Sequence, residues 1–310
     1  MKIKYARIIL SIPFVRSFIH FLKNTYHEKS GVSYFMIYRI FMDEMKTNHI
    51  MERSNNIAFQ FTLAIFPAII FLFTLIPELP IDNLTEEVMN LLQETMPRSV
   101  YSEAEATIAD ILSKSRGGLL SFGFLAALYF ATNGTTALMQ AFNKTYRTKE
   151  SRGFFKSKLV AISLTFLLAF VLFTSILLLI VAQQVLNFIQ ELGLINDDFI
   201  IYLFIALRFL VIFFLFQIAI SVIYYLAPAV EEKWHFFNVG SVLATALCLA
   251  ISFGFSFYIN NFGTYNKLYG SIGALIALMI WFSILSLFLI VGFELNVSLA
   301  RAKNKEFPKV

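Results

Sequence analysis

Six long apolar runs dominate this sequence and restrict what it can fold into. The last run, 271–297, carries one carboxylate, Glu294, near its end. About twenty apolar residues let a helix cross a hydrocarbon core of ~30 Å, and a helix satisfies its own backbone hydrogen bonds there. The pattern predicts an all-α integral membrane protein whose six transmembrane helices lie at 57–76, 119–139, 159–186, 199–227, 237–259 and 271–297.

Composition supports this class. Hydrophobic residues make up 58% of the chain, whereas soluble domains have about 45–50%. The net charge of +5 would favour nucleic-acid binding in a soluble protein, but the cations here gather in particular loops. The one cysteine, Cys248, excludes a disulfide within the chain.

The distribution of Lys and Arg predicts the orientation. Cations are dense before the first run, in the loop 140–158 and in the tail 301–310, and sparse in the loops 77–118, 187–198 and 260–270. Short cytoplasmic loops carry the excess of Lys and Arg. Both termini are therefore expected in the cytoplasm, with 51–300 as the transmembrane domain and 301–310 as a basic cytoplasmic tail.

Two segments outside the runs are amphipathic. Residues 1–50 mix apolar and basic side chains, which favours short helices lying in the membrane surface or a cytosolic helical arm packed on the bundle. The acidic loop 81–116 repeats apolar residues at helical spacing and is interrupted by Pro97. It is expected to form an outer helical hairpin, either as a lid over a cavity or as a packed connector.

Small residues recur at helical spacing in three of the predicted spans. Such ridges let helices approach closely where lipid supplies no hydrophobic drive for association. A homo-oligomer could use one of them. The predicted packing positions are Gly123, Ala127, Ala131, Gly240, Ala244, Ser252, Gly270 and Gly273.

Polar residues inside the runs have two interpretations. They could clamp helices together through hydrogen bonds, or line a substrate path. Arg208 is expected near the membrane midplane, where its planar fork would suit an anionic group, although carbonyl bonding or snorkelling would also account for it. The candidate path residues are Arg208, Glu294, Asn56, Gln60, Asn133, Asn143, Gln217 and Asn296.

Motifs of enzymes are missing from the sequence. It contains no H-E-x-x-H, C-x-x-C or Walker pattern, and its four histidines lie outside the runs. No catalytic residue, metal site or cofactor is therefore predicted, and nucleic acid is not an expected partner. Membrane lipids are the expected partners, with a lipid or small anionic molecule as the expected substrate.

Six stretches of the sequence form a recognisable set in fixed order: NIAFQFTLAIFP (56–67), SRGGLLSFGFLAALYFATNGTTALMQAFN (115–143), YLAP (225–228), NVGSVLA (238–244), YGSIG (269–273) and GFELN (292–296). Together they resemble the YihY/BrkB family of integral membrane proteins, some of which were formerly labelled ribonuclease BN. Two departures are Phe59–Gln60, where the family often has a tyrosine pair, and Phe293, where it usually has alanine. The resemblance implies a six-span protein of the bacterial inner or plasma membrane, in a family without a settled activity.

Two classes of function remain open at this point. The first is a transporter, or a protein that handles lipids or other amphiphiles, with the polar residues along its path. The second is a non-transporting scaffold or envelope-assembly factor. A polar cavity that opens to one side or to lipid would favour the first class, and a tightly packed bundle the second.

Overall fold

A computed structural model describes residues 20, 23–26, 31–47, 49–78, 84–95, 105–106, 108–112, 117–191, 198–230, 235–261 and 271–304. Within these ranges the regular secondary structure is helical, apart from an isolated antiparallel bridge between Tyr26 and Ser33. Its elements are α3 (Tyr34–Thr47), α4 (Ile50–Leu75), η1 (Ile76–Glu78), α5 (Leu84–Thr95), α7 (Gly117–Tyr146), α8 (Phe154–Glu191), α9 (Asp198–Leu226), α10 (Val239–Asn261) and α12 (Ser271–Lys303).

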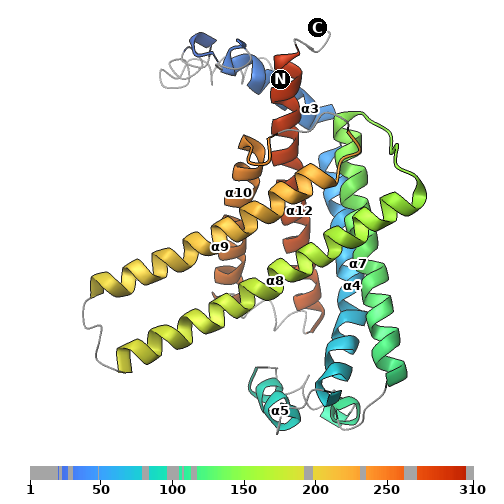
Figure 1. The fold of residues 1–310 in the computed structure, drawn as a ribbon, viewed down its shortest axis with the longest axis vertical. Coiled ribbons are helices and arrows are strands. Elements are labelled where there is room, and N and C mark those ends of the chain that lie inside the picture. The colour runs from blue at the N-terminus through green and yellow to red at the C-terminus, as the bar shows by residue number, and fades with distance from the viewer. Residues whose placement is uncertain are drawn as a thin grey trace.

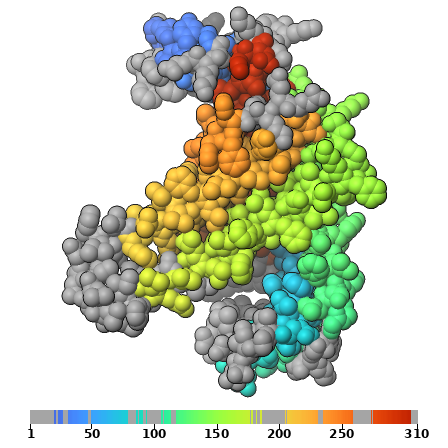
Figure 2. Space-filling model, viewed as in Figure 1, coloured from blue at the N-terminus to red at the C-terminus, as the bar shows by residue number. Residues whose placement is uncertain are grey.

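Six long helices pack in a closed order. α4 contacts α7 and α12, α12 contacts α10, α10 contacts α9, α9 contacts α8, and α8 contacts α7. Figure 1 shows α4 and α7 side by side, while α8 and α9 form a hairpin that leans away from them. In Figure 2 this hairpin lies across the face of the molecule.

Among the described residues, five helices are long and apolar enough to cross a membrane: α4 with η1, α8, α9, α10 and α12. This confirms the predicted fold class. α7, which was predicted as a span at 119–139, is not among the five because its second half is rich in Thr, Asn and Gln. α7 nevertheless lies against α4, with Gly123 at the backbone of Phe71 and Ala141 bonded to Arg53. The count of six spans therefore stays a prediction.

The buried core lies at one end of the bundle. There α4, α8 and α10 begin and α7, α9 and α12 end, and we call this the basic end. Phe142 stacks on Phe293 with 4.3 Å between ring centroids and meets Tyr224 edge to face, so Phe293, one of the departures from the family pattern, fills the centre of the core. Further from this end, large apolar side chains such as Leu72, Phe122 and Phe173 are exposed, as expected for lipid-facing positions.

The two amphipathic segments are described in part. α3 packs through Ile37 and Ile40 against Ala302 of α12, which favours an arm packed on the bundle over a helix lying only in the membrane surface. α5 forms one helix of the expected hairpin beside η1. Where the second helix is expected, residues 105–106 and 108–112 are helical, with Ile108 and Leu112 buried, and their neighbours at 96–104, 107 and 113–116 lie outside the described residues. The choice between a lid and a connector stays open.

Candidate functional site: polar networks and an apolar groove

A cluster of five charges ties α3, α4, α7 and α12 together at the basic end. We call Glu44, Arg53, Arg147, Glu294 and Arg301 the charged cluster. Glu44 of α3 is buried and forms ion pairs with Arg301 and, at 3.1 Å, with Arg147. Arg301 also donates from Nη2 to the carbonyl of Thr145 at 3.2 Å. The last turns of α7 and α12 thus share one carboxylate.

Arg53 is the inner member of this cluster. Its Nη1 donates to the carbonyl oxygen of Ala141 at 2.9 Å and to Oγ1 of Thr145 at 2.8 Å. It is also attracted electrostatically to Glu294, which is fully buried, and to Glu44. A buried carboxylate is retained where an opposite charge offsets its desolvation, so Arg53 accounts for the carboxylate inside the last apolar run.

A second network holds the connection between α7 and α8 against the end of α9. Arg152 donates to Glu150 from Nε at 2.6 Å and reaches the carbonyls of Leu226 and Ala227 at 2.9 and 2.8 Å. Asn143 donates to Glu150 at 3.0 Å and accepts from the backbone N–H of Ala229 at 2.7 Å. The hydrogen bonds from Arg152 are the main reason that the pKa of Glu150 lies below its usual value.

A third network caps the N-terminus of α10. Asn238 accepts from the N–H of Ser241 at 2.8 Å, as an N-cap side chain does. Asn296 of α12 accepts from the N–H of Gly240 at 2.8 Å, and Gln217 of α9 donates to Ser241 at 2.7 Å. Gly240 permits this contact, because a Cβ there would overlap the carbonyl oxygen of Gly292.

The candidate path residues divide between these networks and isolated positions. Glu294 belongs to the charged cluster, Asn143 to the second network, and Gln217 and Asn296 to the third. Gln217 and Asn296 each bond to α10 from another helix, whereas Asn143 bonds to loop residues. The others lie apart: Arg208, Gln60 and Asn133 are partly buried on three helices, and Asn56 is exposed. A role for any of them in a substrate path stays a prediction.

The predicted packing positions also vary in environment. Gly123 touches α4 and Gly240 touches α12, while Ala244 and Gly273 are buried. Ala127, Ala131 and Ser252 are only partly buried, and Ser252 bonds its own helix at the carbonyl of Cys248. Gly270 lies outside the described residues.

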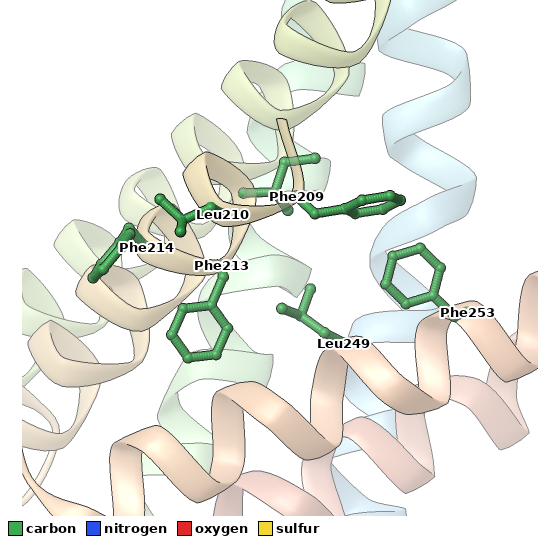
Figure 3. A pocket seen from close by; sticks show the side chains of 7 residues that line it. Phe209, Leu210, Phe213, Phe214, Leu249 and Phe253 are labelled. Carbon is green, nitrogen blue, oxygen red and sulfur yellow. The ribbon is translucent and has the colours of Figure 1, made fainter. Parts of the chain in front are cut away.

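An apolar groove lies between the middle parts of α9 and α10 (Figure 3). Its volume is about 450 Å³. Phe209 of α9 meets Phe253 of α10 edge to face, at 5.3 Å between centroids. Most of the side chains remain exposed, while Ile212 is buried. The lining residues are Phe209, Leu210, Ile212, Phe213, Phe214, Leu249 and Phe253.

Sequence reasoning missed both the partner of Glu294 and this groove. Arg53 precedes the first predicted run at 57–76, whereas Glu294 lies inside the run 271–297, so counting depth along the runs does not pair them. Nothing in the sequence marks the groove, because aromatic residues also face lipid on every side. In the part of the chain that the structure describes, no group of three or more His, Cys, Asp or Glu side chains is placed to hold a metal ion.

Comparison with known proteins agrees with this architecture. Residues 41–309 match the family described as "Virulence factor BrkB". A ribonuclease-like protein of Bacillus subtilis (strain 168), YfkH, is 34% identical over 82% of this chain and 91% of its own length. A UPF0761 membrane protein of Alteromonas mediterranea is 22% identical over 87% of this chain and 90% of its own length. No solved structure matches. The chain therefore belongs to the BrkB family, whose members include proteins named as membrane proteins, and it is a multi-pass membrane protein.

Proposed function

We propose that this protein handles lipid-like amphiphiles, taking an apolar chain from the bilayer into the groove between α9 and α10. The observation that carries the proposal is the position of the groove, near the middle of both helices, together with its wholly apolar lining. Apolar pockets bind ligands that bring little polar surface with them. A molecule already dissolved in the hydrocarbon would reach this groove without crossing a polar surface.

Arg208 supplies the polar half of the proposal. Arg208 lies about 15 Å from the start of α9, at ~1.5 Å per residue. Ile212, which lines the groove, follows one helical turn later. A guanidinium at that depth costs about 2.5–3.5 kcal/mol on insertion scales, and charges kept at such depths usually have a function. We assign Arg208 to the anionic head of the amphiphile, because its fork matches phosphate or carboxylate.

The polar networks favour an amphiphile over a small polar solute. Asn143, Gln217 and Asn296 are buried, and their hydrogen bonds join α7 to neighbouring loops and α9 and α12 to α10, so in this arrangement they hold the bundle together. A hydrophilic solute would need polar groups facing an open space. An apolar chain needs only the groove.

We do not propose the nuclease activity that the name of the B. subtilis relative suggests. Glu231 and Glu232, the acidic pair in the loop before α10, lie outside the described residues. If the chain were a nuclease using this pair, Glu231→Gln with Glu232→Gln would abolish RNA cleavage by the pure protein. We expect no cleavage beyond the buffer control, in either protein.

The groove is tested by filling it. Leu249→Trp places a larger ring among Phe209, Phe213 and Phe253, whereas Leu207→Trp adds the same ring at an exposed position outside the groove. Each protein is purified in mild detergent, and the lipids that remain bound are measured by mass spectrometry. An amphiphile retained by the wild type and Leu207→Trp but lost from Leu249→Trp supports the proposal. Equal retention by all three proteins contradicts it and favours the scaffold.

A further inference from the structure

A second pocket, of about 190 Å³, opens at the basic end between the last turns of α7 and α12. Liquid water occupies ~30 Å³ per molecule, so the pocket has room for a group the size of a phosphate. We call it the arginine pocket. It is lined by Tyr146, Arg147, Val297, Ala300, Arg301 and Asn304.

The charge around this pocket is positive. Arg147 and Arg301 share one carboxylate, Glu44, and Glu294 interacts instead with Arg53. Each guanidinium carries five N–H donors, and the hydrogen bonds described above engage one nitrogen of Arg147 and two of Arg301. The side chain of Arg147 is 66% exposed, so it has donors to offer to a ligand.

Arg147 also occupies a backbone position that suits glycine. Its φ is 57°, and the N–H of Thr148 reaches back to the carbonyl of Asn143 at 2.9 Å, which is the pattern of a helix end that usually carries glycine. An arginine here accepts left-handed strain that glycine would avoid. Its ion pair with Glu44 is a weak reason for the strain, because Arg147 is largely exposed and Glu44 is already paired with Arg301.

The depth of the pocket indicates where its ligand comes from. Val297 closes the apolar run of α12, and Arg301 follows one turn later, so the pocket lies where hydrocarbon gives way to headgroups. We propose that the arginine pocket binds the phosphate of an anionic lipid headgroup at the membrane surface. The phosphate would accept hydrogen bonds from Arg147 and Arg301, with Val297 beneath it. This site is separate from the groove and does not depend on the proposed function.

Arg147→Gly tests the proposal without risking the fold. Glycine suits the backbone at this position, so thermal stability without added lipid should hold or rise. Lys156→Gln is the matched control, because it removes one exposed charge at the basic end and does not line the pocket. Arg147→Lys retains the charge and should bind at an intermediate level.

Each protein, purified in a neutral detergent, is titrated with phosphatidylglycerol, phosphatidylcholine or inorganic phosphate while its thermal unfolding is followed. Phosphatidylglycerol should stabilise the wild type and Lys156→Gln at the same concentrations. Arg147→Gly should need about tenfold more phosphatidylglycerol for the same stabilisation, as expected for the loss of one charge-assisted hydrogen bond. The proposed site would be wrong if all variants reached half-maximal stabilisation at the same phosphatidylglycerol concentration. It would also be wrong if Arg147→Gly and Lys156→Gln lost affinity for phosphatidylglycerol equally. Stabilisation by inorganic phosphate but not by phosphatidylglycerol would overturn its assignment to a lipid.

Discussion

Single charged residues fall into two groups, those within the networks of the basic end and Arg208 in the middle of α9. Arg53 belongs to the first group and is 8% exposed. Arg53→Gln removes the hydrogen bonds to Ala141 and Thr145 and leaves Glu294 buried without its cation. Breaking a buried charge pair from one side typically costs about 3–5 kcal/mol, so we expect a large fall in melting temperature or a failure to fold.

The control for Arg53 is Arg39→Gln, which removes an exposed cation from α3 and should shift unfolding little. Circular dichroism or tryptophan fluorescence of the purified proteins during heating measures both. Similar melting temperatures for the two variants would show that Arg53 and Glu294 do not depend on each other.

Arg208 should behave in the opposite way. Arg208→Gln removes a charge whose insertion costs about 2.5–3.5 kcal/mol, so the variant should insert, fold and unfold at the same temperature or a higher one. If Arg208 holds an anionic head, retention of anionic amphiphiles should fall, and Arg208→Lys should restore it poorly because a point charge lacks the fork. A misfolded Arg208→Gln protein would instead identify the arginine as structural.

At the scale of elements, α10 and α12 approach closely where Gly240 and Gly292 face each other. A Cβ at Gly240 would overlap the carbonyl oxygen of Gly292 and lie 2.6 Å from Cγ of Asn296. Gly240→Ala must therefore separate the helices or break the cap from Asn296. Overpacking of this kind costs about 1–3 kcal/mol, which should lower the melting temperature.

Gly254→Ala is the matched control on the same helix. Nothing lies within 4 Å of a Cβ at Gly254, and alanine in a helix interior gains up to about 1 kcal/mol over glycine. The two glycine-to-alanine variants should therefore change stability in opposite directions. Equal effects would mean that the contact between α10 and α12 is looser than described.

For the whole molecule, the Lys/Arg bias predicts that both termini and the basic end face the cytoplasm. Asn90 of α5 and Ser151, which precedes α8, are both exposed. Cysteines placed at these two positions should lie on opposite sides of the membrane. In a Cys248→Ser background, a membrane-impermeant thiol reagent added to intact cells should label position 90 and not 151. Labelling of both positions from outside would refute the predicted orientation.

The sequence alone determined the class of this protein, because hydrophobicity and helical periodicity are local properties. Runs of apolar residues located the six long helices of the described chain, although α4, α7, α8 and α12 continue past those runs at the basic end. Phe59–Gln60, the other departure from the family pattern, stands on α4 with Phe59 exposed, and nothing in the structure explains it. The family was recognisable from short motifs such as YLAP and GFELN.

The tertiary structure decided which polar groups meet and where an apolar ligand would fit. Glu44 and Arg301 are 257 positions apart in the chain, and Arg53 and Ala141 are 88 apart, so no local pattern pairs them. The groove exists because side chains of α9 and α10 line it together, with Phe209 meeting Phe253 from the other helix. Such contacts depend on how the helices rotate and tilt, and those angles are set by packing at close approaches such as Gly240 with Gly292.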